Sequence, residues 1–535
     1  MPKYIFISGG VLSGLGKGTT TASLATILAQ KGFRTTATKI DMYINVDAGT
    51  IRPQEHGEVF VTADGIETDQ DLGTYERFLN INLNKSNYIT TGQVYWQVID
   101  RERCFAYDGE DVEAIPHVSD EIIRRIKLAG EKNRAEIVLI ELGGTTGEYQ
   151  NSLFFEAARQ MKLKSPKDVL HVHVGYLPIP KSIGEMKSKP VQQSVKALQS
   201  MGIQPDFVVG RSEKYIDGRR RERIALFCNV HPNDVISNPD VNNIYELPMV
   251  LEAQKFGDKI LAKLSLKKRK MDMKNWEQLI KKVKNIKRKI KIGVVGKYFA
   301  TGDFVLSDVY ISVIEAIKHG CWANDLEPNL IWIDSEDIEK RGTSVLKDVD
   351  AIVVPGGFGG RGTEGIIKSI QFARENKKPF LGLCYGLQMA VIEFARNVAG
   401  LKNANTTEID PNTPHPVIYI MSEQEKHMKE KHYGATMRLG SYLCRIKKNT
   451  LAYAAYGQNK ISERHRHRYE VNNKYRSRFE KKGLIFSGTS PDNHLVEMIE
   501  IKNHPFFIAT QFHPEFQSRP LSPHPLFVGL IKATK

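Results

Sequence analysis

The sequence predicts an α/β protein with two doubly wound domains, and three observations support this fold class. The chain has 535 residues, which is enough for roughly two to four domains. Continuous apolar runs recur in both halves, as expected of parallel strands buried on both faces. Glycine-rich turns follow several of these runs and lead into stretches of helical periodicity.

The first half, residues 1–265, opens with a β-loop-α-β pattern. Apolar residues predict a strand over 4–8, a helix over 19–30 and a second strand over 34–40. Two further continuous apolar runs, "AEIVLIEL" and "DVLHVHVGYL", predict buried strands. We therefore expect a parallel sheet in this half.

A basic segment, residues 266–291, follows the first half and is expected to be a helical linker. It contains twelve Lys or Arg residues and two acids, a net +10 of the chain's +15. The apolar residues recur at helical spacing: Trp276, Leu279, Ile280, Val283 and Ile286. Because the remaining chain is near neutral, the charge indicates a solvated linker and not a nucleic-acid binder, and a specific polyanion site on this helix is the alternative.

The second half, residues 292–535, repeats the α/β pattern. The strand-like runs "IKIGVVGKY" and "DAIVVPGGFGG" are each followed by a predicted helix, over 310–319 and 363–376. The stretch "PFLGLCYGLQMAVIEF" then predicts a strand that turns directly into a helix. This order again favours a doubly wound domain.

The loop "SGGVLSGLGKGTT" is a candidate phosphate-binding loop. Backbone N–H groups of a glycine-rich loop, a lysine and a helix N-terminus together favour a polyphosphate. The candidate nucleotide-binding residues are Gly14, Leu15, Gly16, Lys17, Gly18 and Thr19. The spacing departs from the usual motif because Gly18 follows the lysine, so a flexible βα turn is the alternative.

Two carboxylates are candidate magnesium ligands, since phosphoryl transfer needs hard oxygen ligands for a bridging metal. Asp71 lies in "ETDQDLGTYERF", and Glu141 ends an apolar strand, where doubly wound sheets hold their ligands. A turn or capping role is the alternative for each acid.

Cys384 stands between two glycines at a predicted strand-to-helix turn, the form of a nucleophile elbow. The helix N-terminus would favour its thiolate, although an isolated cysteine is often buried and inert. His513 and Glu515 follow another strand and supply a base and its orienting carboxylate. Gly356 and Gly357 follow a third strand and offer backbone N–H groups to an oxyanion.

The run "ERHRHRYEVNN" alternates histidine with arginine. Arginines beside His465 and His467 would repel a cation, so we expect an anionic ligand here and not a metal.

The chain resembles the CTP synthase family, class I glutamine amidotransferases fused to an ATP-dependent synthetase, almost from end to end. The resemblance rests on "YINVDAGTIRPQEHGEVFVTADGIETDQDLGTYERF", "RIALFCNV", "ERHRHRYEVNN" and "QFHPEF". It implies an N-terminal P-loop-like synthetase domain and a C-terminal glutamine amidotransferase domain. It further implies that ATP phosphorylates UTP and that ammonia, released from glutamine at Cys384, His513 and Glu515, displaces the phosphate to give CTP.

The resemblance also assigns site residues. It implies that Lys17, Lys39 and Asp71 contact ATP and that Asp71 and Glu141 bind Mg²⁺. The implied UTP-site residues are Ser13, Lys187, Gln192 and Arg223. The implied glutamine-holding residues are Gly357, Gln388, Glu408 and Arg468. The loop "YGATMRLG", with Thr436 and Arg438, resembles the segment through which GTP activates the family. CTP as feedback inhibitor and a homotetramer are further expectations from the family.

Two other functions stay open at this point. The chain could be an amidase that uses a carboxylate acceptor, or a structural relative whose sites have decayed, given departures from the family pattern at Glu113, Gln150 and Arg223. Because glycines soon interrupt the apolar start "MPKYIFISGG", we expect no secretory signal, and we expect no membrane-spanning run. Five scattered cysteines indicate a reducing compartment, so we expect a cytoplasmic protein without membrane or nucleic-acid partners.

Overall fold

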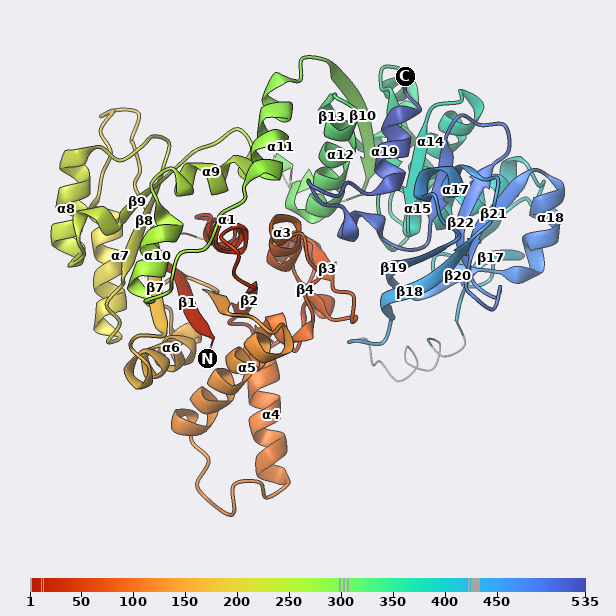
Figure 1. Ribbon diagram of the computed structural model, residues 1–535. Helices are drawn as coiled ribbons and strands as arrows, with labels where there is room; N and C mark the ends of the chain where they lie inside the picture. The colour runs from red at the N-terminus through yellow and green to blue at the C-terminus, as the bar shows by residue number, and fades with distance from the viewer. Residues whose placement is uncertain are drawn as a thin grey trace. The chain divides into compact units, whose positions relative to one another are not determined.

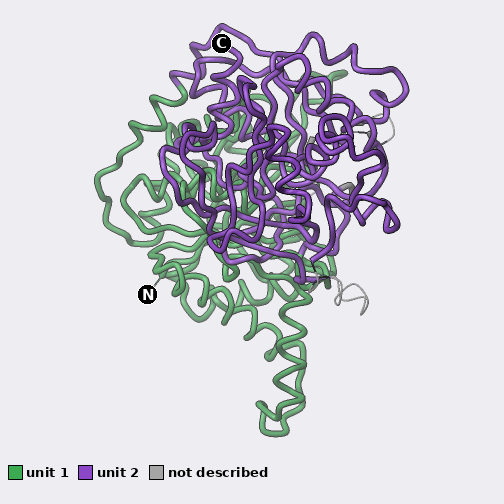
Figure 2. Tube along the Cα trace, turned by 90° about the vertical axis from the view of Figure 1, so that its right-hand side faces the viewer, with its two compact units in different colours: residues 1–47, 71–280 green, residues 48–70, 281–535 purple. Residues whose placement is uncertain are grey.

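The computed structural model describes residues 2–535 except 11, 13, 298–299, 302–303, 306, 422–423 and 425–433. The chain forms two compact units, coloured separately in Figure 2. Unit 1 contains residues 1–47 and 71–280, and unit 2 contains residues 48–70 and 281–535.

Unit 1 is built on a parallel sheet, as predicted. Within the described residues this sheet has seven strands in the order β5-β2-β6-β1-β7-β8-β9, and each neighbouring pair is parallel. The strands are β1 (Lys3–Gly9), β2 (Thr35–Asp41), β5 (Tyr88–Thr90), β6 (Ile137–Leu142), β7 (Val169–Tyr176), β8 (Phe207–Ser212) and β9 (Val235–Pro239). Their side chains are buried almost throughout, because helices cover both faces of a doubly wound sheet.

Helices connect the strands of unit 1. In Figure 1, α4 and α5 form a pair that extends beyond the sheet. The helices are α1 (Lys17–Gln30), α3 (Gln70–Leu79), α4 (Thr91–Arg103), α5 (Ser119–Lys132), α6 (Ser152–Lys164), α7 (Lys189–Ser200), α8 (Gly218–Cys228), α9 (Leu247–Glu252) and α10 (Phe256–Lys263). The first helix begins at Lys17, two residues before the predicted start.

Unit 2 contains a mixed sheet, with the order β13-β10-β14-β15-β23-β22-β21-β18-β19 in the part of the chain that is described. The half from β13 to β23 is parallel, whereas the half from β23 to β19 is antiparallel. The strands are β10 (Lys289–Gly296), β13 (Glu327–Asp334), β14 (Ala351–Val354), β15 (Phe380–Leu383), β18 (Arg438–Ile446), β19 (Lys460–His467), β21 (Leu484–Thr489), β22 (Val496–Ile501) and β23 (Phe507–Thr510). The parallel half matches the predicted doubly wound pattern.

Smaller elements complete unit 2. A separate sheet joins β16 (Ala404–Thr406), β17 (His415–Ile420) and β20 (Tyr469–Val471), and two short strands, β11 (Ala300–Thr301) and β12 (Phe304–Val305), pair with each other. The helices are α2 (Pro53–His56), α12 (Ile311–Ala323), α13 (Ser335–Arg341), α14 (Thr363–Glu375), α15 (Tyr385–Asn397), α17 (Leu451–Tyr456), α18 (Arg476–Lys481) and α19 (Pro525–Lys532). Among the described helices we find no candidate for a membrane-spanning segment.

Residues 48–70, which lie inside the predicted first domain, pack with unit 2. They contain a hairpin of β3 (Val59–Val61) and β4 (Glu67–Asp69). The Ser441 N–H donates to the Ala63 carbonyl at 2.9 Å, and Arg464 Nη1 donates to the Val61 carbonyl at 3.0 Å. The compact units therefore do not follow the predicted boundaries at 265 and 291, because the partners of this hairpin are on β18 and β19.

The linker helix is present as α11 (Lys274–Asn285), shorter than the basic segment. Trp276 is 1% exposed, and its ring lies 5.7 Å from that of Phe78 and 5.9 Å from that of Tyr245. Trp276, on the apolar face predicted from the spacing, thus packs among aromatic residues of unit 1.

Candidate active sites

The glycine-rich loop of unit 1 connects β1 to α1 and turns through left-handed backbone conformations. Gly14 has φ 71° and Gly16 has φ 86°, a region that favours glycine. Lys17 follows directly as the first residue of α1, and its ammonium donates to the Gly144 carbonyl at 2.5 Å. Burial, the largest effect, lowers the pKa of Lys17, while the carboxylates of Glu141 and Asp71 oppose that shift.

Lys39, Asp71 and Glu141 meet beside this loop, although they come from three separate elements. The Lys39 ammonium pairs with Asp71 and lies 3.6 Å from Glu141. The Tyr75 hydroxyl donates to Glu141. Burial, together with the charge of Asp71, raises the pKa of Glu141 to about 7, which is the behaviour of two carboxylates that share a poorly solvated site.

Gly18 is the residue that departs from the usual phosphate-loop motif, and the structure explains it. A Cβ atom at Gly18 would lie 2.3 Å from Asp71 Oδ1 and 3.7 Å from Glu141 Oε2. The carboxylates therefore face the first turn of α1 closely enough to exclude a side chain. A serine or threonine directly after Lys17 would displace Asp71.

The same carboxylates fit a Mg²⁺ ion. Two hard oxygen donors beside a phosphate loop match the way this ion binds, through one or two carboxylates, phosphate oxygens and water. Among the described residues there is no group of three or more His, Cys, Asp or Glu that could enclose a metal ion. A metal here would take its remaining ligands from nucleotide and water.

Three of the four predicted UTP-site residues lie on α7, on α8 or just before α7. Ser13 falls outside the described residues. Lys187 pairs with Glu185 at 2.7 Å, and Gln192 on α7 is buried and donates to Ser188 Oγ at 3.0 Å. Arg223 on α8 stacks over Phe227. Within the described part of the chain, no hydrogen bond or ion pair joins Lys187, Gln192 and Arg223.

Cys384 occupies the turn between β15 and α15, with φ 52° and ψ −97°. This strained conformation is costly for a non-glycine residue and is typical of functional sites. The flanking glycines are needed for space: a Cβ at Gly382 would lie 2.9 Å from the Gly386 carbonyl carbon, and one at Gly386 would lie 2.5 Å from the Val354 carbonyl oxygen. The side chain is 5% exposed and lines a cavity of about 90 Å³.

His513 and Glu515 line the same cavity. His513 Nδ1 lies 2.7 Å from Glu515 Oε1, and Nε2 has no hydrogen-bond partner among the described residues. A Cβ at Gly356 would lie 2.9 Å from His513 Cε1 and 3.8 Å from Cys384 Cβ, so the imidazole and the cysteine face the same glycine. Burial alone would lower the pKa of His513, but Glu515 and Cys384 raise it to about 10.

Part of the cavity wall comes from residues 48–70, which sequence reasoning assigned to the other catalytic half. Pro53, Glu58 and Val59 line the cavity together with Gly356 and Gly357. Glu58 accepts hydrogen bonds from the Ser312 N–H and hydroxyl. No local sequence signal could have located this wall, because the residues it contacts are hundreds of positions away.

Of the predicted glutamine-holding residues, Gly357 shares the cavity with Cys384 and Gln388 lies on the helix that begins beside it. Gly357 lines the cavity. Gln388, one turn along α15, donates to the Tyr469 carbonyl at 3.2 Å. Glu408 accepts from the Gly359 N–H at 2.7 Å. Arg468 donates to Gln424 Oε1 at 2.7 Å and to Thr436 Oγ1 at 2.8 Å.

Lys297 is a buried cation that sequence reasoning did not find. Its ammonium donates to the Gly359 carbonyl, to the Phe358 carbonyl at 3.3 Å and to the Tyr385 hydroxyl at 2.8 Å. Burial lowers the pKa of Lys297 to about 8. The lysine thereby ties the loop after β14 to the helix that begins beside Cys384.

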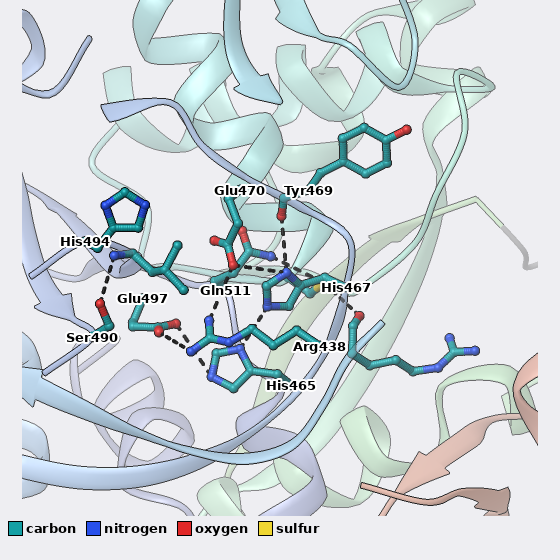
Figure 3. A network of polar contacts seen from close by, with 12 residues as sticks. Arg438, His465, His467, Tyr469, Glu470, Ser490, His494, Glu497 and Gln511 are labelled. Carbon is teal, nitrogen blue, oxygen red and sulfur yellow. Dashed lines mark hydrogen bonds and ion pairs between the residues drawn. The ribbon is translucent and has the colours of Figure 1, made fainter. Parts of the chain in front are cut away.

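The alternating run on β19 points its side chains in two directions. His465 and His467 are buried in a polar network, in which His465 Nδ1 and His467 Nε2 are 2.9 Å apart. Arg438 lies in the same network, 2.8 Å from Glu497 and 3.4 Å from Glu470 (Figure 3). Burial lowers the pKa of both histidines, so neutral rings are stabilised here.

The arginines of this run face the 48–70 segment. Arg464 donates to the Val61 carbonyl, and Arg466 Nε donates to Glu67 Oε1 at 2.7 Å. All three arginines of the run therefore have protein partners, since Arg468 donates to Gln424 and Thr436, and an anionic ligand at this run stays a prediction.

Comparisons with known proteins agree with this architecture. A family model described as "CTP synthase N-terminus" matches residues 3–266, and one described as "Glutamine amidotransferase class-I" matches residues 305–533. A CTP synthase of Caldanaerobacter subterraneus is 50% identical over 535 residues, covering 100% of this chain and 98% of the relative. A CTP synthase of Carboxydothermus hydrogenoformans is 51% identical over 536 residues, covering 100% and 99%.

A solved structure is also similar. The Trypanosoma brucei CTPS glutaminase domain with bound acivicin is 36% identical, covers 46% of this chain and 93% of that structure, and has a TM-score of 0.42. The likeness to the curated relatives extends over the whole chain, and the family models match both halves. The chain therefore belongs to the CTP synthase family.

Proposed function

We propose that Cys384, His513 and Glu515 release ammonia from glutamine and that Lys17, Lys39, Asp71 and Glu141 serve the ATP-dependent step. The overall reaction is the conversion of UTP to CTP with ATP and with glutamine as nitrogen source. The carboxylate-accepting alternative is not favoured, because CTP synthases match the chain over its full length.

The observation that carries the glutaminase assignment is the placement of Cys384 on a strained elbow in one cavity with the His513–Glu515 pair. His513 Nε2 takes the thiol proton, and Cys384 Sγ bonds to the amide carbon of glutamine. The carbonyl electron pair moves to oxygen, which the N–H groups beside Gly356 and Gly357 stabilise. The carbonyl bond re-forms as the carbon–nitrogen bond breaks, and the proton on His513 passes to the leaving nitrogen, so that ammonia departs. Water then hydrolyses the glutamyl thioester to glutamate and restores the thiol.

In unit 1, the supporting observation is the convergence of Lys17, Lys39, Asp71 and Glu141 on the glycine-rich loop. The uracil O4 of UTP bonds to the γ-phosphorus of ATP as ADP leaves. Ammonia then bonds to C4, and phosphate leaves with loss of a proton. Asp71 and Glu141 would hold Mg²⁺, which when bound neutralises charge on the phosphates. The loop residues Gly14 to Thr19 would cradle the phosphates, and Ser13, Lys187, Gln192 and Arg223 would contact UTP.

The remaining assignments rest on the family resemblance. They are activation by GTP, feedback inhibition by CTP and a homotetramer. The boundaries 1–265, 266–291 and 292–535 rest instead on the basic segment between the two halves. Thr436, an expected GTP-linked residue, bonds Arg468, whereas Arg438 is held inside the buried network of Figure 3. A cytoplasmic location is supported by the five cysteines, which are all free.

Replacing Cys384 by alanine tests the glutaminase assignment. We expect C384A to lose glutamine-dependent CTP formation by at least about a thousandfold, as for the removal of a nucleophile, and to form CTP from ammonium. Glutamine-dependent activity that survives in C384A would contradict the assignment. The matched control is Cys321→Ala, because Cys321 is buried in the apolar core on the same unit and outside the cavity.

A further inference from the structure

Besides His513, the described residues provide the sulfur of Cys384 with two hydrogen-bond partners of opposite character. The Arg466 carbonyl oxygen lies 3.7 Å from Sγ and accepts from the thiol. The Gln511 amide nitrogen also lies 3.7 Å from Sγ and donates a hydrogen bond to the sulfur. An acceptor stabilises the thiol, whereas a donor stabilises the thiolate.

Gln511 is held in place by its position in the chain. It follows β23 directly, two residues before His513, and its side chain is fully buried. Its backbone N–H donates to the Glu497 carbonyl at 2.8 Å. Glu497 belongs to the buried network with Arg438 and His465, and Figure 3 shows Gln511 beside that network. The backbone of Gln511 is therefore fixed against a rigid, charged cluster.

One end of the Gln511 amide is left without a partner in the described part of the chain. Its Oε1 atom has no hydrogen-bond partner among the described residues, and such a buried oxygen costs free energy. The Arg466 carbonyl already gives the sulfur a hydrogen-bond acceptor. A donor is therefore the more favourable second partner, and the Gln511 amide presents its nitrogen to the sulfur. A buried amide in this state indicates a functional role more than a stabilising one.

We propose that Gln511 is a further catalytic residue, whose amide N–H stabilises the Cys384 thiolate. This proposal rests on the assignment of Cys384 as the nucleophile. When the thiol proton moves to His513 Nε2, the negative charge stays on Sγ, and the Gln511 N–H donates to it. Sγ then bonds to the glutamine amide carbon and the charge moves to oxygen, so that no other reactant is required.

Alkylation of Cys384 tests the proposal, because iodoacetamide reacts with the thiolate. The full chain is treated across a pH series, and modification of the Cys384 peptide is followed by mass spectrometry. For Gln511→Met, which keeps the volume and removes the donor, we expect about tenfold slower alkylation at neutral pH and an upward shift of the profile midpoint by about one pH unit, as for a lost hydrogen bond to a charged group. An unchanged midpoint in Q511M would overturn the proposal.

A second variant separates hydrogen bonding from packing. Gln511→Glu keeps the shape and places a carboxylate near the sulfur, so it should slow alkylation more than Q511M does. Equal alkylation rates for Q511E and wild type would also overturn the proposal. This second comparison still tests the proposal if Q511M does not fold. Gln517→Met is the matched control, since its amide donates to the Ser462 carbonyl at 3.0 Å and not to sulfur. Circular dichroism checks the fold of each variant.

The outcomes distinguish the two assignments. Complete alkylation of wild-type Cys384 that leaves glutamine hydrolysis intact would refute Cys384 as the nucleophile. Loss of hydrolysis on alkylation, combined with identical pH profiles for wild type and Q511M, would refute only the role of Gln511.

Discussion

The ion pair between Glu67 and Arg466 joins residues 48–70 to the cysteine site, and its removal should impair both stability and glutamine hydrolysis. Glu67 on β4 is 1% exposed, and its Oε1 lies 2.7 Å from Arg466 Nε, on a side chain that is 20% exposed. The carbonyl of the same arginine contacts Cys384 Sγ. A displacement of the Arg466 side chain can therefore move the backbone carbonyl that contacts Cys384 Sγ.

The size of the effect follows from the burial. Glu67→Ala leaves a mostly buried guanidinium without its carboxylate, a change that costs about 3 to 5 kcal/mol for fully buried pairs. Because Arg466 keeps some solvent contact, we expect the lower end, about 3 kcal/mol. Glu67→Gln retains a neutral acceptor and should cost about 1 to 2 kcal/mol. A shift of the β19 backbone by about 1 Å could lower glutamine hydrolysis by up to about a hundredfold.

Thermal unfolding and steady-state glutamine hydrolysis measure the two consequences. Glu55→Ala is the matched control, because Glu55 lies in the same segment, is exposed and carries the same charge. We expect the order wild type, E55A, E67Q and E67A for both stability and hydrolysis. If E67A hydrolysed glutamine at the rate of E55A and unfolded at the same temperature, the reasoning would be refuted.

Two further predictions concern pH and the phosphate loop. The pKa of His513 is raised to about 10, above its unfolded value of about 6.5. Protonated His513 therefore stabilises the fold fully below about pH 6.5, and this contribution is lost as the pH rises through 10. In Glu515→Gln, the melting temperature should fall less steeply between pH 6.5 and 10 than in wild type, and parallel curves for the two proteins would contradict the assignment. In Gly18→Ala, the new Cβ atom would lie 2.3 Å from Asp71 Oδ1 and should lower CTP formation about a hundredfold with either glutamine or ammonium. Glutamine hydrolysis, measured in parallel, should persist. CTP formation at the wild-type rate in G18A would show that the loop tolerates the side chain.

Much of the arrangement of the candidate sites was predictable because its signals are local in the sequence. The glycine-rich loop and Lys17 are adjacent, Cys384 lies between its two glycines, and His513 and Glu515 are two residues apart. Each of these groups is positioned by a single strand-to-helix or strand-to-turn junction. Continuous apolar runs likewise predicted the parallel strands, since both faces of those strands are buried.

The antiparallel half of the second sheet was harder to predict. Strand β19 has the sequence "KISERHRH", yet most of its residues are buried. Its charged side chains enter the interior because they pair with acids or backbone carbonyls contributed by other elements. Hydrophobic periodicity cannot indicate such a strand, since burial here depends on partners that the local sequence does not contain.

The sequence by itself determined the α/β fold class, the family resemblance, the tight turn at Cys384 and the glycine-rich loop before Lys17, because each depends on residues close together in the chain. Only the tertiary structure decided that residues 48–70 form a wall of the cysteine cavity, that Glu67 pairs with a residue 399 positions away, and that Gln511 reaches a sulfur 127 positions away. Contacts at such separations form only when the folded sheet brings distant strands together, so no local pattern encodes them.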